Sequence, residues 1–208
     1  YYTEITADQY VWANPVGDTI AFLVASAFHD LFIMKSVDNG DSWEKTVIWE
    51  HPYPLFDFNT MTMDTVFVCD NSASIALDNN GKCHVVFGIN RVMVPTITNP
   101  PGSYNYFPYV DGIGCWNEDM PAFSNDLNAM APPQYGYPTS ELIEDVNYIG
   151  RTQDVNGDDT ITFITTATSF PMGYRELGVS TMPSVTIGPD NEIGVIFSST
   201  TETYDNVE

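Results

Sequence analysis

The chain has 208 residues, of which 28 are acidic and six are Lys or Arg, so its formal net charge is −22. Such a surface repels nucleic acid and anionic membranes, and no apolar run approaches the roughly 20 residues that span a bilayer. These properties exclude nucleic-acid binding as a default and predict a protein that does not span a membrane. Hydrophobic residues make up 43% of the chain, which predicts a globular core.

Cys69, Cys83 and Cys115 have no C-x-x-C spacing, which argues against a zinc site. They allow either one disulfide with a free thiol or three buried thiols. The chain starts without Met or a signal peptide, so we expect a mature or excised piece of a longer protein. The acidic surface suits a secreted protein and divalent cations.

Three strand-length runs follow one another early in the chain, over 19–25, 29–35 and 43–50, and turn residues separate them. They predict a three-stranded meander. The aromatic segment 1–13 predicts one further strand that packs on a neighbour.

Two segments far apart in the chain, 74–88 and 184–198, align without a gap as strand, turn and strand. A third segment, 154–164, has a related turn followed by β-branched residues. Recurrent units of this kind predict a repeat β architecture in which each unit buries its faces against its neighbours. We therefore expect blade-like units near 14–50, 73–118, 146–168 and 182–202, with long loops at 95–109 and 119–145 and one helix at 139–145.

A tight turn joins two strands of the meander, with the sequence Ser36-Val37-Asp38-Asn39-Gly40-Asp41-Ser42-Trp43. Asp, Asn and Gly tolerate positive φ, and a carboxylate at position 38 can accept backbone N–H bonds across the turn. We expect a buried tryptophan to close the hairpin end. The predicted structural residues of this turn are Ser36, Asp38, Gly40, Ser42 and Trp43.

This turn has the pattern S-x-D-x-G-x-[ST]-W, which resembles the Asp-box, or BNR repeat, of sialidases and many non-enzymatic β-propellers. The resemblance implies an all-β fold: a β-propeller of which three to four blades of a larger ring lie in this chain. An open set of blades would expose strand edges, so either sequence outside the chain or another copy closes the ring, and we predict the former. The resemblance also implies that the Asp-box is a folding element at the rim of a blade and takes no part in catalysis.

Turn 77–81, segment 111–118 and Met182-Pro183-Ser184 extend the resemblance to secreted BNR-type propellers of Bacteroidetes-like bacteria. That resemblance implies an extracellular or cell-surface protein that is exported as cargo of a type 9 secretion system. The implied partners are a glycan or a protein at the cell surface, together with outer-membrane secretion machinery.

The segment Asp154-Val155-Asn156-Gly157-Asp158 places oxygen ligands at alternate positions, and it resembles the opening of an EF-hand loop. This spacing lets Asp154, Asn156 and Asp158 converge on a hard cation such as calcium. The sixth position is Asp159 instead of Gly, and the twelfth is Thr165 instead of Glu. A polar β-turn without a metal is therefore the alternative interpretation.

Aromatic side chains gather in the loop-rich part of the chain. Exposed aromatic rings stack on sugars or anchor protein partners, whereas buried rings only pack the loops. The sequence leaves both roles open. The candidate ligand-binding aromatics are Tyr104, Tyr106, Tyr109, Trp116, Tyr135 and Tyr137.

Catalysis has less support in the sequence. A sialidase needs three arginines around a carboxylate, and Arg91, Arg151 and Arg175 are the only arginines here. The family's [FY]-R-I-P motif is absent, so we expect the arginines to pair with acidic side chains. The sequence thus favours a non-catalytic binder, with a sialidase-like glycoside hydrolase as the alternative, and it predicts no catalytic residue.

Overall fold

The computed structural model describes residues 5–54, 57–98, 103–107, 109–158, 160–161 and 177–202. Within these ranges the regular elements are β-strands and short 3-10 helices at Ala7–Gln9 and Pro133–Tyr135. The strands form three antiparallel sheets, and each sheet is open. The predicted all-β fold class is therefore confirmed. No helix in the described ranges is long and apolar enough to cross a membrane.

The first sheet is an antiparallel meander of β1 (Tyr10–Trp12), β2 (Ile20–Val24), β3 (Leu31–Ser36) and β4 (Glu44–Trp49). Its strands follow the predicted apolar runs. Side chains alternate between the two faces, as a period of two requires. The partners Leu23 and Ile33 are fully buried, whereas the next partners, Phe22 and Met34, are only partly buried.

The second sheet has the order β5 (Val66–Leu77), β6 (Cys83–Met93), β8 (Ile113–Asn117) and β9 (Tyr148–Gly150). A two-residue strand, β7 (Asn105–Tyr106), pairs with the end of β6. Positions 83–90 of β6 are all buried. Val85 belongs to the large core shared with the first sheet, whereas Val86 belongs to a smaller core on the opposite face. Because both faces are covered, β6 is a nearly continuous apolar run.

The third sheet is the hairpin of β10 (Ser180–Ile187) and β11 (Ile193–Ser199). Its pairing matches that of the β5–β6 hairpin. Ser74 pairs with Val86 in the earlier hairpin, and the residues aligned with them, Ser184 and Ile196, pair in the later one. The gapless sequence alignment therefore corresponds to the same strand register in space.

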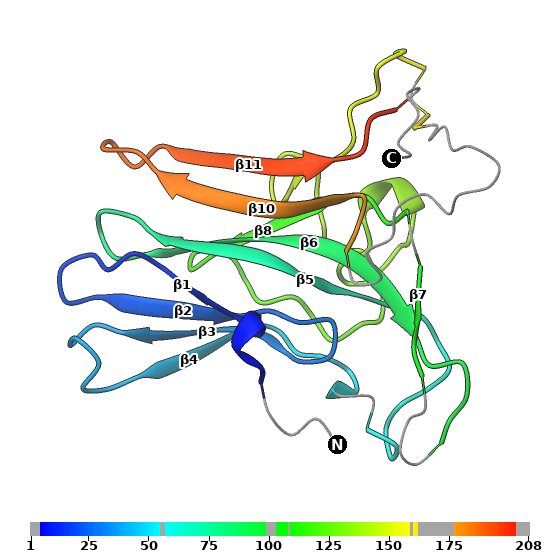
Figure 1. The fold of residues 1–208 in the computed structure, drawn as a ribbon, viewed down its shortest axis with the longest axis horizontal. Helices are drawn as coiled ribbons and strands as arrows, with labels where there is room; N and C mark the ends of the chain where they lie inside the picture. The colour runs from blue at the N-terminus through cyan, green and yellow to red at the C-terminus, as the bar shows by residue number, and fades with distance from the viewer. Residues whose placement is uncertain are drawn as a thin grey trace.

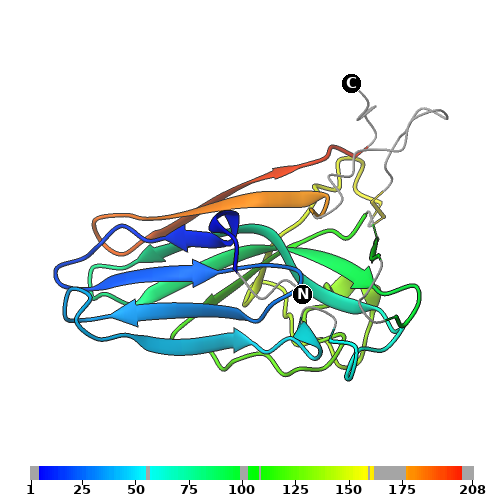
Figure 2. The ribbon, with the colours of Figure 1, turned by 60° about the horizontal axis from the view of Figure 1, so that its bottom comes forward.

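The three sheets are stacked, with the second sheet in the middle (Figure 1). β5 contacts β1 and β2 of the first sheet and also β10 of the third. After a rotation of 60° the β10–β11 hairpin still lies on one side of the other two sheets (Figure 2). The middle sheet is thus the one that each of the others packs against.

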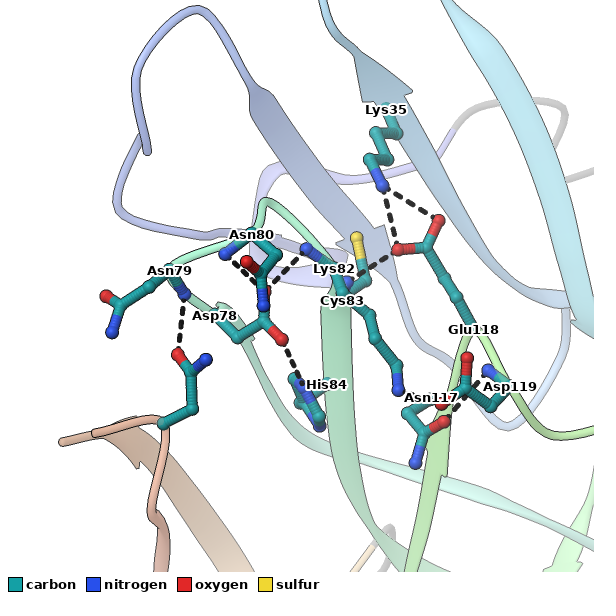
Figure 3. A network of polar contacts seen from close by, with 11 residues as sticks. Lys35, Asp78, Asn79, Asn80, Lys82, Cys83, His84, Asn117, Glu118 and Asp119 are labelled. Carbon is teal, nitrogen blue, oxygen red and sulfur yellow. Dashed lines mark hydrogen bonds and ion pairs between the residues drawn. The ribbon is translucent and has the colours of Figure 1, made fainter. Parts of the chain in front are cut away.

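Polar contacts at one end of the sheets link the three layers (Figure 3). The Glu118 carboxylate accepts two hydrogen bonds from Lys35 Nζ of the first sheet, at 2.9 and 2.8 Å, and one from the Cys83 backbone N–H of the second, at 2.7 Å. The Asn79 backbone N–H donates to Asn191 Oδ1, in the turn of the third sheet, at 2.9 Å. These bonds fix how the layers sit relative to one another.

The predicted helix at 139–145 is not formed. Its backbone groups bond elsewhere: the Glu141 N–H donates to the carbonyl of Ala129 at 2.9 Å, and the Glu141 carbonyl accepts from the side chain of Asn147 at 3.0 Å. Asp145 then has a φ of 61°, which ends any helical path. Contacts from outside the segment outweigh its weak helical preference.

The expected unit 146–168 is described only in part. β9, inside the expected unit 146–168, extends the second sheet, whereas residues 162–176 lie outside the described ranges.

The three cysteines are free thiols, two of them buried and Cys115 partly buried. Of the two alternatives for the cysteines, the structure therefore has the one without a disulfide.

Candidate functional site

The Asp-box turn between β3 and β4 is closed by its own side chains. Ser36 Oγ accepts the Gly40 N–H at 2.8 Å and donates to Asp38 Oδ1 at 2.7 Å. Asp38 also accepts the Ser42 backbone N–H at 2.8 Å and its hydroxyl at 2.5 Å. The hydrogen bonds from Ser42, followed by that from Ser36, lower the pKa of Asp38 to about 2. The carboxylate is therefore ionised at neutral pH, and its hydrogen bonds are made within the turn.

Trp43 is 38% exposed, so the prediction that it is buried is wrong. It lies with Tyr10, Trp12 and Phe22 in what we call the outer aromatic face of the first sheet. Ring centroids are 4.8 Å apart for Trp12 and Phe22 and 5.5 Å apart for Phe22 and Trp43. The Trp43 indole N–H donates to the Gly40 carbonyl at 3.1 Å. The ring packs against the side of the hairpin and remains partly exposed to solvent.

A buried carboxylate, Asp70, lies at the register break of β5. Its Oδ1 accepts the backbone N–H and the hydroxyl of Ser72, at 2.7 and 2.6 Å, and its Oδ2 accepts the Gly178 N–H at 3.2 Å and the Thr181 hydroxyl at 3.0 Å. Burial raises the pKa of Asp70 to about 6, and these four donors oppose the rise. Asp70 thus anchors the start of β10 to the middle sheet.

Asp111 has a similar position before β8. It accepts the Thr152 N–H at 3.0 Å and the Ser180 hydroxyl at 2.5 Å, and burial raises its pKa. Asp70 and Asp111 therefore both bond to groups at the beginning of β10. Their carboxylate oxygens accept hydrogen bonds that hold the second and third sheets together, which is a structural role.

The candidate aromatics fall into separate groups. Trp116 is 4% exposed, and its indole N–H donates to the Pro121 carbonyl at 3.1 Å. This ring belongs to the core and is not available to stack on a ligand. Tyr104 and Tyr106 pack against Phe28, with ring centroids 4.9 and 6.2 Å apart, and both are partly buried.

Tyr109, Tyr135 and Tyr137 are brought together where β5 begins and β6 ends. The Tyr135 hydroxyl donates to the Tyr109 carbonyl at 2.9 Å. The rings of Tyr135 and Tyr137 pack on buried Phe67, with centroids 5.7 and 5.5 Å away. Tyr109 and Tyr135 are both exposed. Although Tyr135 is partly open to solvent, desolvation by the surrounding protein, followed by the charge of Asp111, raises its pKa to about 12, so its hydroxyl stays protonated.

Arg91, near the end of β6, lies among the same rings. Its guanidinium carbon is 5.1 Å from the ring centroids of Phe67 and Phe107 and 5.7 Å from that of Tyr137. Nη2 donates to Thr65 Oγ1 at 2.6 Å, whereas Nε is buried without a hydrogen-bond partner. We call the group the Arg91 site; it consists of Arg91, Phe67, Phe107, Tyr135 and Tyr137.

Arg91 and Arg151 differ in whether a carboxylate pairs with them. In the described ranges no carboxylate forms an ion pair with Arg91, whereas Arg151 Nη1 lies 3.5 Å from Glu144 Oε1. The expectation of acidic partners therefore holds for Arg151 and is wrong for Arg91. Arg175 lies outside the described residues.

The predicted calcium ligands are only partly assembled. Asp154 and Asp158 form an acidic cluster with buried Glu202, and the oxygens of the three lie within 4.8 Å of one another. Glu202 also accepts the Val155 N–H at 2.6 Å. Asn156 Oδ1 instead accepts the Asp158 N–H at 2.9 Å, so this oxygen stabilises the turn and does not point to the cluster as a ligand. The cluster is a set of hard oxygen donors of the type that binds calcium.

Comparisons with protein-family models, with curated proteins and with solved structures found no match for the chain. The function is therefore inferred from the sequence and from the geometry of the side chains. The sequence did not single out Phe67 or Glu202. Phe67 resembles any other strand residue, and Glu202 lies far along the chain from the turn that it joins.

Proposed function

We propose that the chain is part of an Asp-box β-propeller that binds a glycan or a protein partner without catalysis. Three stacked antiparallel sheets, two of them with hairpins of equal register, support radial blades. The Asp-box turn lies between the third and fourth strands of a four-stranded meander, at the end of a blade-like unit.

Two exposed apolar surfaces support the same proposal. The outer aromatic face carries Trp12, which is 60% exposed. In the described ranges, no strand pairs with the outer edge of β11, and beside it lies a mainly apolar groove of about 350 Å³ lined in part by Val146, Ile149 and Ile193. In a propeller, neighbouring strands and blades would cover both surfaces, and apolar edges are otherwise avoided.

The observation that carries the binding proposal is the Arg91 site. Tyr, Trp and Arg are the side chains that most often dominate binding surfaces, because they combine large apolar area with polar groups. Here the side chains of Tyr135, Tyr137 and Arg91 converge at one end of the middle sheet, and the Tyr135 hydroxyl donates to the Tyr109 carbonyl. The strands hold Phe67 and Arg91 as register partners, so the loops meet a fixed base.

An extracellular or cell-surface location, with export by a type 9 secretion system, completes the proposal. It rests on the Asp-box resemblance and on the excess of acidic over basic residues. In this setting the partners are a surface glycan or protein and, during export, the outer-membrane secretion machinery.

Binding should be tested on a glycan array and by pull-down from cell-surface proteins, with Tyr135→Ala compared with the parent chain. Tyr10→Ala is the matched control, since Tyr10 is exposed to a similar extent but lies on the outer aromatic face. We expect Tyr135→Ala to lose binding and Tyr10→Ala to keep it. Equal binding by all three proteins contradicts the proposal, and release of sugars that Arg91→Ala abolishes favours the sialidase-like hydrolase instead.

We also propose calcium as a ligand of the acidic cluster, with Asp154, Asp158 and Glu202 as donors. Titration calorimetry with Ca²⁺ should show heat of binding for the parent chain and a loss of it for Asp154→Ala. Asp190→Ala, at an exposed turn acid, is the control. Identical heats for the parent and Asp154→Ala contradict a calcium site there.

A further inference from the structure

We propose that the free edge of β11 and the groove beside it accept one β-strand from a separate polypeptide, with a large apolar side chain opposite Val195. The groove, of about 350 Å³, shares no lining residue with the Arg91 site. The inference therefore goes beyond the proposed function and does not depend on binding at that site. It rests on the repeat between the β5–β6 and β10–β11 hairpins.

The first step is that the two hairpins face the same way in the stack of sheets. In the earlier hairpin, Val85 and Phe87 belong to the core shared with the first sheet. The residues aligned with them, Val195 and Phe197, pack against the smaller core between the second and third sheets. Each hairpin thus turns the equivalent face toward the sheet before it, so the repeat includes the packing as well as the register.

The second step is the strand that the later hairpin lacks. The edge of β6 that does not pair with β5 pairs with β8, a single strand of five residues, along positions 84–88. The aligned positions of β11 are 194–198. In the described part of the chain, no strand pairs with them on that edge. The repeat therefore predicts one short strand there, paired with β11 as β8 is paired with β6.

The third step is the place of the groove. Trp116 of β8 is the register partner of Val85, and it is buried in the core that faces the first sheet. A strand in the same register on β11 places its equivalent residue opposite Val195, on the same face of the sheet. Val195 lines the groove together with Val146 and Ile149, which are both exposed. A large apolar side chain from the added strand would cover these two residues.

The fourth step is the source of the strand. The residues that directly follow β11 are held by other contacts. The Thr200 N–H donates to the Val179 carbonyl at 3.1 Å, and the Glu202 carboxylate accepts the Val155 N–H at 2.6 Å. In residues 200–202 the chain therefore does not turn back to pair with β11. An exposed strand edge flanked by a side-chain groove is the arrangement by which proteins bind extended peptides of other chains.

The probe is a fluorescent peptide that copies residues 112–117, with Cys115→Ser to prevent disulfide formation. Fluorescence anisotropy compares it with the same peptide carrying Trp116→Ala. We expect the parent chain to bind the tryptophan peptide at least about 10-fold more tightly, because the ring is the anchor. Ile193→Asp in the chain puts a charge into the groove and should weaken binding by a similar factor. Ile196→Asp is the matched control, since Ile196 is exposed on the other face of the same strand, and it should change nothing.

Amide hydrogen exchange distinguishes strand pairing from binding in the groove alone. Bound peptide should slow exchange within 194–198, and unchanged exchange overturns strand pairing. Failure of both peptides to bind the parent, or equal affinities of the two, overturns the inference even where Ile193→Asp does not fold.

Two further outcomes identify a different occupant or a different site. If the chain without peptide is a dimer that Ile193→Asp converts to a monomer, a second copy covers the edge and the separate polypeptide is overturned. Tyr135→Ala should leave peptide binding unchanged. Loss of binding in that variant places the peptide at the Arg91 site, so the inference fails while the proposed function gains support. Failure of the peptide to bind leaves the glycan and pull-down tests of the proposed function unaffected.

Discussion

Replacing Asp70 with Asn tests whether one buried carboxylate controls the pH dependence of stability. In the folded chain the pKa of Asp70 is about 6, against an ordinary value of 3.8, because burial outweighs its four hydrogen-bond donors. Between these two values the folded state holds a proton that the unfolded state has released. The stabilisation is therefore complete below about pH 4 and is lost as the pH rises through 6, and its size is about 3 kcal/mol.

Asp70→Asn removes the titration and keeps the shape of the side chain. An amide has one acceptor oxygen, so a donor such as the Gly178 N–H loses its partner, at a cost of about 1–3 kcal/mol at any pH. The parent should accordingly be much more stable than the variant at pH 4. The advantage should shrink by about 3 kcal/mol between pH 4 and pH 7.

Urea unfolding of both proteins, followed by tryptophan fluorescence at several pH values from 4 to 7, measures this difference directly. Other groups titrate in the same range, but they do so in both proteins and cancel in the comparison. A difference that does not change with pH means that Asp70 does not titrate there. If the stability advantage of the parent grows as the pH rises, the four hydrogen-bond donors outweigh burial. The pKa of Asp70 is then lowered instead of raised, and the reasoning is refuted.

Two further substitutions test the contacts between layers. Gly88→Ala would place a Cβ in collision with Asp70 Oδ2, so it should lower the free energy of unfolding by about 1–3 kcal/mol. Gly194→Ala is the control, since its nearest atom is Thr186 Cγ2 at 3.1 Å, and equal losses would contradict the overpacking argument. Glu118→Gln should cost about 1 kcal/mol in urea unfolding, because the charge that accepts from Lys35 and the Cys83 N–H is removed. Asp119→Asn should have almost no effect, because the Asp119 side chain is 77% exposed, and an equal loss in both variants would show that Glu118 does not couple the sheets.

The strands that sequence predicted best are those in which an apolar run ends at a strong turn signal. β2 and β3 are bounded by such turns, and the β10–β11 hairpin repeats the pattern of an earlier one. The beginning of β5 had no such signal. It contains Asp70 and its polar neighbours, which are buried only because another sheet supplies their donors.

The exposure of Trp43 was mispredicted for a related reason. The local sequence places the Trp43 indole beside the turn, where its N–H donates a hydrogen bond to the Gly40 carbonyl. Whether the ring is buried depends on what packs on the outer aromatic face, which is a property of neighbouring layers. Likewise, segment 139–145 has helical composition, but hydrogen bonds to Ala129 and Asn147, which lie outside the segment, determine its backbone.

The candidate site shows the same division between local and long-range information. Composition pointed to Tyr109, Tyr135 and Tyr137, and the fold brings them together. Composition also suggested that Arg91 has acidic partners, since acids are abundant. Strand pairing instead sets Arg91 opposite Phe67, and the loops then surround it with rings.

The position of Arg91 on a paired strand has a consequence for binding. Phe67 and Arg91 are register partners on β5 and β6, the two strands that the outer sheets pack against, so the cation is held before a ligand arrives. Little conformational entropy of this arginine then remains to be lost on association. Tyr109, Tyr135 and Tyr137 come from connecting segments, where substitution disturbs the core less. Loop variants should therefore change which ligand binds, whereas changes at Phe67 should alter the fold and the ligand site together.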